Sequence, residues 1–195
     1  MIYVAMESRA MTEVNLIDNK FEMGKIDDAW EHIIRFEEEI VSPDFEIMRD
    51  RWSTRMKDLK GIILLKRGDL DSAEELARQC LEVATKRQYK KYMGRAERLF
   101  GQILAERGAY DLSEAKLMQA LANLEKVGNP KQIWLTHTAL AILYEKMNRS
   151  DLEQKQWQAA ASIIKSTADD LEDKEVQKTF INASPVQEIL EQANC

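Results

Sequence analysis

Apolar residues along this chain recur at spacings of three and four rather than at every second position. The clearest stripes are Leu99, Phe100, Ile103 and Leu104, followed by Leu117, Leu121 and Leu124. Such spacing places apolar side chains on one face of a helix. No segment carries a convincing run of alternating β-branched residues. The pattern therefore predicts an all-α protein.

A small residue and a turn residue repeat along the chain with a period of forty. The small residues are Gly61, Gly101 and Ala141, and seven positions after each stand Gly68, Gly108 and Asn148. A fixed period of this length is typical of stacked supersecondary units. We therefore predict pairs of antiparallel helices joined by tight turns.

The period divides the chain into about four helical hairpins within a single domain. Their expected ranges are about 7–43, 44–86, 87–127 and 130–167. The first hairpin turns at Gly24, which lies 44 residues before Gly68, so we expect the loop at Ser42–Pro43 to absorb the excess. Residues 172–193 are predicted to form a cap of two short helices, because a terminal repeat needs a polar outer face. Ser184 is its expected second N-cap, with Pro185 as the first helical residue.

Three acidic residues mark the expected starts of the second helices. Each is followed three positions later by Glu or Gln, in the pairs Asp71 and Glu74, Asp111 and Glu114, and Asp151 and Gln154. This spacing is that of a capping box, in which the two side chains satisfy amides of the first turn. We therefore predict these three aspartates to be N-caps.

The recurring small residues predict close helix packing. Gly61, Gly101 and Ala141 would let the second helix of the same hairpin approach. Cys80, Ala120 and Ala160, each twelve residues after a turn, would let the next first helix dock. A bulky residue at such a position should overpack the contact and cost about 1–3 kcal/mol or more.

These residues together resemble the tetratricopeptide repeat (TPR) family over about residues 10–167. Further matches are Leu64, Leu104 and Tyr144 four residues before the turns, Ala29 and Ala73 five residues after them, and Pro130 between hairpins. Ser113 and Glu153 depart from the expected alanine, and a period of forty exceeds the usual thirty-four or so. The resemblance is to the long-repeat variety of bacterial regulators, ATPases and kinesin light chains. It implies a right-handed α-solenoid whose first helices line a concave binding face.

Composition favours a helix-rich protein without a membrane span or a disulfide framework. The chain is 45% hydrophobic and 32% charged, with 7 glycines and 3 prolines. No apolar run approaches the roughly 20 residues of a membrane helix, and MIYVAMESRAM lacks the basic start and apolar stretch of a signal peptide. Cys80 lies in a helical pattern and Cys195 is the last residue, so a cytoplasmic location is expected.

Charge is unevenly distributed. The total is −6, with −8 in residues 1–48, +6 in 49–107 and −4 in 108–195. A basic middle could steer an acidic partner, and the run Glu37–Glu39 could pair with the basic middle of another copy. The alternative for both is a solvated, highly charged helical surface.

No residues form a recognisable catalytic or metal-binding motif. His32 and His137 are far apart in sequence, and His137 is interpreted as a partly exposed structural residue. The acidic cluster Asp69, Asp71, Glu74 and Glu75 lacks the spacing of a calcium loop and is interpreted as helix capping. We therefore expect no enzyme activity, no cofactor and no metal.

The candidate contacts for a partner lie on the first helices and point away from the second ones. They are Arg55, Asp58, Ile62, Lys66, Arg95, Arg98, Gln102, Glu106, Thr138 and Ile142. Arg95 and Arg98 lie one helical turn apart and, with Arg55 across the groove, could clamp a carboxylate or an acidic peptide. The alternative is a solvated basic face paired with its own acidic neighbours.

The leading functional hypothesis is a non-enzymatic interaction module that binds a protein or peptide, with acidic groups, on its concave face. The alternative is a regulatory or sensor region of a larger bacterial signalling or transcription protein. The string FINASPVQEIL resembles the end of TPR regions in such proteins. Self-association is open in both hypotheses. Neither a nucleic acid nor a membrane is expected as a partner.

Overall fold

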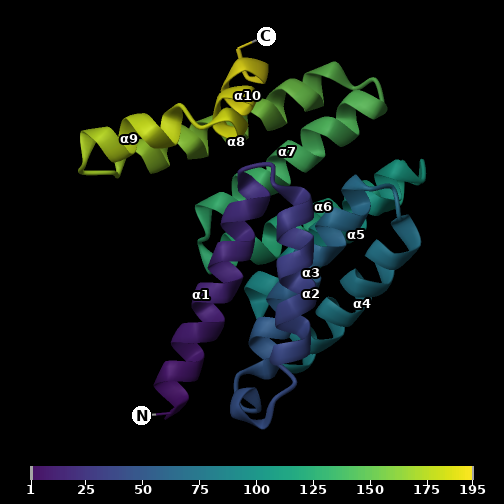
Figure 1. Cartoon of the computed structure of the whole chain (residues 1–195). Coiled ribbons are helices and arrows are strands. Elements are labelled where there is room, and N and C mark those ends of the chain that lie inside the picture. Colours follow the sequence, from purple (N-terminus) through teal and green to yellow (C-terminus); the bar gives the residue numbers. More distant parts are fainter. Residues whose placement is uncertain (1, 195) are drawn as a thin grey trace. The chain divides into compact units, whose positions relative to one another are not determined.

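The computed structural model describes residues 2–194, and side chains from residue 4 onward. Within that range the chain forms α-helices and one short 3-10 helix, with no strand, so the predicted all-α class is confirmed (Figure 1). The helices are α1 (Ile2–Glu22), α2 (Ile26–Glu39), η1 (Pro43–Phe45), α3 (Arg49–Lys66), α4 (Leu70–Lys86), α5 (Lys90–Glu106), α6 (Tyr110–Val127), α7 (Pro130–Lys146), α8 (Ser150–Asp169), α9 (Lys174–Ile181) and α10 (Ser184–Gln192). None of these helices is long and apolar enough to cross a membrane.

The chain divides into two compact units, and the division falls inside α5. Unit 1 ends at Leu99 and unit 2 begins at Phe100. In unit 1, α1 packs against α2 and α3 packs against α4. In unit 2, α7 packs against both α6 and α8, and α9 and α10 pack on α8 (Figure 1).

The four predicted turns all contain a residue in the left-handed conformation. These residues are Gly24 (φ 74°), Gly68 (φ 81°), Gly108 (φ 76°) and Asn148 (φ 55°). In each turn the following N–H donates to the carbonyl five residues earlier, from Lys25 to Lys20, Asp69 to Leu64, Ala109 to Leu104 and Arg149 to Tyr144. This bond satisfies carbonyls at the end of a helix and favours Gly or Asn at the left-handed position. The predicted turns are therefore confirmed.

The predicted capping boxes are wrong, because each second helix begins before its aspartate. Asp71, Asp111 and Asp151 are the second residues of α4, α6 and α8, where their charge favours the helix dipole. The N-caps are Asp69, Ala109 and Arg149. Of these three, only Asp69 caps with its side chain, accepting a 3.1 Å hydrogen bond from the amide of Ser72. The turn geometry, rather than the acidic residue, sets where the helix starts.

The extra residues of the first hairpin form η1 and part of the core of unit 1. Phe45 of η1 is buried and meets Phe36 of α2 edge to face, with ring centroids 6.0 Å apart. Arg49, the first residue of α3, donates 3.0 Å hydrogen bonds to the carbonyls of Ile40, Val41 and Ser42. The loop is therefore fixed by aromatic packing on one side and by one guanidinium on the other.

The two helical glycines pack as predicted in unit 2 and differently in unit 1. A Cβ on Gly101 would lie 2.6 Å from the Cγ and Cδ2 atoms of Leu117, on α6 of the same hairpin. A Cβ on Gly61 would meet Leu99 on α5 at 2.6 Å, whereas Leu76 of its own hairpin is 3.6 Å away. Gly61 therefore accommodates the next first helix most closely, and its own second helix also lies in van der Waals contact.

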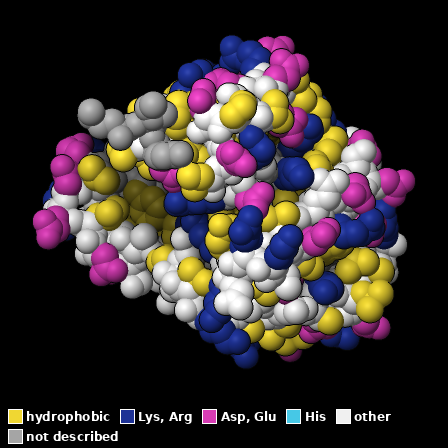
Figure 2. All heavy atoms as spheres, turned by 90° about the horizontal axis from the view of Figure 1, so that it is seen from below, with side chains coloured by type: hydrophobic (Ala, Val, Ile, Leu, Met, Phe, Trp, Pro, Cys, Tyr) yellow, Lys and Arg dark blue, Asp and Glu magenta, His cyan; other side chains and the backbone are white. Residues whose placement is uncertain are grey.

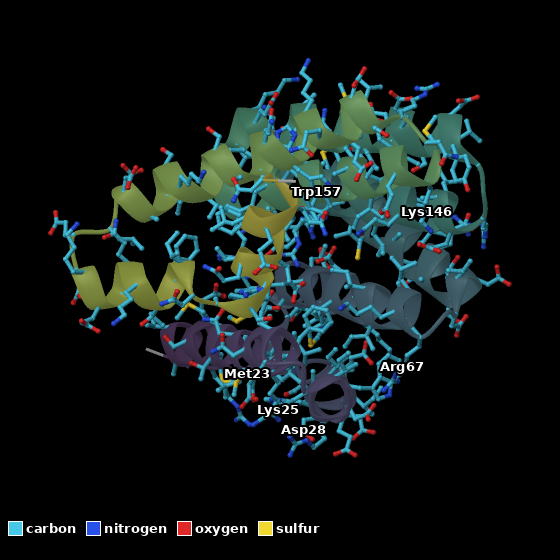
Figure 3. All side chains as sticks on the ribbon, turned by 90° about the horizontal axis from the view of Figure 1, so that it is seen from above. Met23, Lys25, Asp28, Arg67, Lys146 and Trp157 are labelled. Carbon is cyan, nitrogen blue, oxygen red and sulfur yellow. The ribbon has the colours of Figure 1, made fainter. Side chains whose placement is uncertain are left out.

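The C-terminal residues form two short helices, as predicted, and they cover an aromatic cluster of unit 2. Trp134 and Trp157 are buried there with Val186 and Ile189 (Figure 3 labels Trp157). The ring of Phe180 lies 5.8 Å from that of Trp134. The N-cap of α10 is Ala183 rather than Ser184, because the helix begins one residue earlier than predicted.

Candidate functional site

Charged residues of α1, α3 and α5 come together in unit 1. Arg95 on α5 forms an ion pair with Asp58 on α3, and its Nε atom donates a 2.7 Å hydrogen bond to Oδ2 of that residue. Arg55 on α3 forms an ion pair with Asp18 on α1 and donates a 3.0 Å hydrogen bond to Asn15. In both ion pairs the aspartate precedes the arginine by 37 residues. The same kind of aspartate–arginine ion pair therefore links α1 to α3 and α3 to α5.

The structure corrects the expectation that these side chains line an open groove. The exposed fractions of Asp58, Arg95 and Arg98 are only 1%, 8% and 5%. The predicted clamp does hold carboxylates, but they belong to Asp58 and Asp18 of the chain itself. The helical period shows which residues face away from the second helices, but not how closely neighbouring first helices pack.

The pKa values of the two buried arginines shift in opposite directions. Burial opposes the charge of Arg95, but the carboxylates of Asp58 and Asp18 outweigh it and raise the pKa of this guanidinium. Burial lowers the pKa of Arg98 to about 10, and repulsion from Arg95 contributes to the shift. Both groups remain protonated at neutral pH.

The accessible edge of this cluster contains two further cations. Arg51 pairs with Glu7 at 2.9 Å and lies 4.8 Å from the ring centre of Trp52. Lys91 is half-buried and has no hydrogen bond or ion pair among the residues that the structure describes. Burial lowers its pKa, and repulsion from Arg95, Arg55 and Arg51 adds to that effect. We call Arg51, Arg55, Lys91 and Arg95 the cationic face.

Several residues of this cluster were not among the predicted contacts. Glu7, Asn15 and Asp18 all lie on α1, the helix whose hairpin matched the repeat least well. Tyr92, whose pKa is raised mainly by burial, lies beside the same arginines. The repeated separation of 37 residues between aspartate and arginine is the sequence signal that could have revealed Asp18.

The remaining predicted contacts do not join the cationic face. In unit 1, Ile62 is half-buried, and the ammonium of Lys66 lies 5.3 Å from the ring centre of Phe21. In unit 2, Glu106 accepts 2.9 Å hydrogen bonds from Lys146, and Thr138 donates to the carbonyl of Trp134. Gln102 and Ile142 also belong to unit 2 and are half-buried and exposed, respectively.

The acidic N-terminal segment and the basic segment that follows it are largely paired with each other within unit 1. Acidic residues of the N-terminal segment pair with basic residues of α3 and its C-cap. The pairs are Glu7 with Arg51, Asp18 with Arg55, Asp27 with Arg67, and Glu37 with Lys60. Figure 3 labels Arg67 and Asp28, the sequence neighbour of Asp27. Figure 2 shows acidic and basic side chains intermixed over the visible surface. Within the described part of the chain, Lys91 of the cationic face has no such pair, although it is half-buried beside three arginines.

The other polar features of the described residues give weaker support for a binding site. His32 lies 2.5 Å from a carboxylate oxygen of Glu13, and His137 lies 2.7 Å from the amide oxygen of Gln156. No group of three or more metal-ligating side chains occurs among the residues described. A shallow hollow of about 530 Å³ on α8 is lined by Gln158, Ser162, Lys165, Asp169, Asn194 and their neighbours.

The chain matches no family model and no curated protein. Function is therefore argued from the chemistry of the cationic face.

Proposed function

We propose that the chain is a TPR-like α-solenoid and a non-enzymatic interaction module, which binds an acidic segment of a partner protein at the cationic face. The observation that supports this most directly is the half-buried, unpaired ammonium of Lys91 beside three arginines. Four cations form the face, whereas Glu7, Asp18 and Asp58 supply three carboxylates. The excess positive charge favours an anionic ligand.

The two ion pairs, one buried and one half-buried, prepare this face for binding. Asp18 and Asp58 hold Arg55 and Arg95 in fixed orientations, so little side-chain freedom is lost when a ligand arrives. Lys91 and Arg51 lie at the accessible edge and would make the first charge-assisted hydrogen bonds to a ligand carboxylate. The arginines behind them add an attractive field that acts before contact and weakens with salt.

A selection from a random peptide library tests this proposal. We expect the wild-type chain to enrich peptides rich in Asp and Glu, and their affinity to fall as salt rises. Lys91→Glu places a carboxylate beside the arginines and should weaken binding of a selected peptide about tenfold or more. Fluorescence anisotropy with that peptide measures the effect.

Lys90→Glu is the matched control, because Lys90 is the exposed neighbour of Lys91 on the same helix. It changes the net charge equally and should change binding much less. The proposal fails if selected peptides show no acidic preference, or if both variants weaken binding equally.

A further inference from the structure

The outer face of α6 is apolar, although it lies on the surface of unit 2. Leu112 and Met118 are 63% and 48% exposed, and Ala115 and Ala122 between and beyond them are also exposed. The opposite side of the same helix contributes buried leucines to the core, among them Leu117. Because these outer residues are exposed, no part of the described chain covers this face of α6.

The equivalent second helices do not share this property. Forty residues before Ala115, Met118 and Ala122, α4 exposes Glu75, Arg78 and Glu82. Forty residues after them, α8 exposes Lys155, Gln158 and Ser162. The hairpin scaffold therefore does not require apolar residues at these positions, and on α6 they call for another explanation.

We propose that this face binds α6 of a second copy of the chain, in an antiparallel arrangement. With a two-fold axis between Met118 and Gln119, each Ala115 meets Ala122 of the partner subunit, and these small side chains let the two helices approach closely. Asp111 in the first turn then lies opposite Lys126 of the partner subunit, in its last turn. Two such pairs of opposite charge flank the apolar centre.

Self-complementarity is what identifies the second copy as the partner. An antiparallel two-fold contact requires one surface that matches itself in shape and charge. The outer face of α6 meets both conditions, with small residues on either side of its centre and opposite charges at its two ends. Because a single pair of helices buries little area, the dimer should be weak and concentration-dependent.

Sedimentation equilibrium of the full chain tests the proposal. We expect a monomer–dimer equilibrium, and Met118→Glu should raise the dimer dissociation constant about tenfold or more, because it would bury a carboxylate in the interface. Gln158→Glu, at the equivalent exposed position of α8, is the control and should leave the equilibrium unchanged. Circular dichroism verifies that both variants remain helical. A wild-type chain that stays monomeric up to about 500 µM, or a dimer unaffected by Met118→Glu, would overturn the proposal.

Disulfide cross-linking tests the orientation. In a Cys195→Ser background, Met118→Cys places a thiol beside the two-fold axis and should give a covalent dimer under mild oxidation. Leu112→Cys places the two thiols at opposite ends of the interface and should not cross-link. Efficient cross-linking at position 112 but not at 118 would overturn the antiparallel arrangement.

Discussion

The first helices of the two units carry different chemistry at the same repeat positions. Arg55 in α3 and Arg95 in α5 bind carboxylates of a neighbouring helix, whereas α7 in unit 2 has Leu135 at the position forty residues further on. The position of Asp58 in α3 is likewise taken by Thr138 in α7. Ion pairs therefore add to the apolar packing of the first helices in unit 1, where α3 contributes Trp52 and Met56 to the core, while α7 packs through Trp134 in an aromatic and aliphatic cluster.

This difference separates stability from recognition. Apolar burial as in unit 2 contributes directly to folding. A buried ion pair contributes little net stability, because desolvation offsets the attraction between its charges. The charges of α3 and α5 are thus poorly explained by the stability of unit 1 alone. Their presence agrees with the proposed use of the cationic face in binding.

The largest expected effect comes from removing one member of the buried ion pair. Asp58→Leu leaves the guanidinium of Arg95 buried without its carboxylate and should lower the free energy of unfolding by about 3–5 kcal/mol. The double variant Asp58→Leu/Arg95→Met replaces the pair by apolar groups and should lie within about 1 kcal/mol of wild type or be more stable. Urea unfolding followed by circular dichroism measures both.

If the double variant is as unstable as the single variant, the ion pair itself stabilises unit 1. That result would contradict the proposed difference between the two units. Amide hydrogen exchange shows which helices lose stability in the single variant. Destabilisation by Asp58→Leu should appear in α3 and α4, which pack together in unit 1.

The counterpart in unit 2 is the aromatic contact beneath the C-terminal helices. Phe180→Ala removes a half-buried ring from Trp134 and should cost about 1.5–3 kcal/mol, less than for a fully buried phenylalanine. Faster amide exchange confined to α9 and α10 would show that these helices open separately from α7 and α8. Val176→Ala, at an exposed position of α9, is the control and should have little effect.

The fold could be predicted from the sequence where one physical requirement selects one residue type. The left-handed turn positions demand Gly or Asn, so Gly24, Gly68, Gly108 and Asn148 marked the helix ends correctly. Helix starts were less certain, because an aspartate favours both the N-cap and the first turn. The helix starts predicted from Asp71, Asp111 and Asp151 therefore lie after the actual N-caps along the chain.

The candidate site could be located on the first helices but not described in detail. Its arginines were identified because they face away from the second helices. Burial of Arg95 and Arg98 depends on how closely α1, α3 and α5 pack, which side-chain periodicity does not specify. Asp18 lies forty residues before Asp58, but it was missed because the first hairpin was aligned on Gly24, which lies 44 residues before Gly68.

The helical glycines allow the packing of the two units to be compared directly. Gly101→Ala would press a Cβ against the Cγ and Cδ2 atoms of Leu117 and should destabilise by about 1–2 kcal/mol. Gly61→Ala meets only the terminal Cδ2 atom of Leu99 at such short distance, and that atom can move. Its gain of about 1 kcal/mol in helix propensity should then leave stability nearly unchanged. Equal losses in urea unfolding would mean that Leu99 is held as rigidly as Leu117.

The smallest expected effect concerns the caps of two equivalent second helices. Asp69 (φ −83°, ψ 76°) caps α4 with its side chain, whereas Ala109 (φ −86°, ψ 62°) has the same backbone conformation at the start of α6 but no capping group. Asp69→Ala should destabilise unit 1 by about 1 kcal/mol, and Ala109→Asp should stabilise unit 2 by a similar or smaller amount. Thermal unfolding combined with amide exchange in α4 and α6 measures both changes. A loss in stability for Ala109→Asp would mean that a carboxylate at this turn is opposed by neighbouring charge. In that case the two turns, alike in backbone, would differ in their electrostatic surroundings, as the first helices of the two units do.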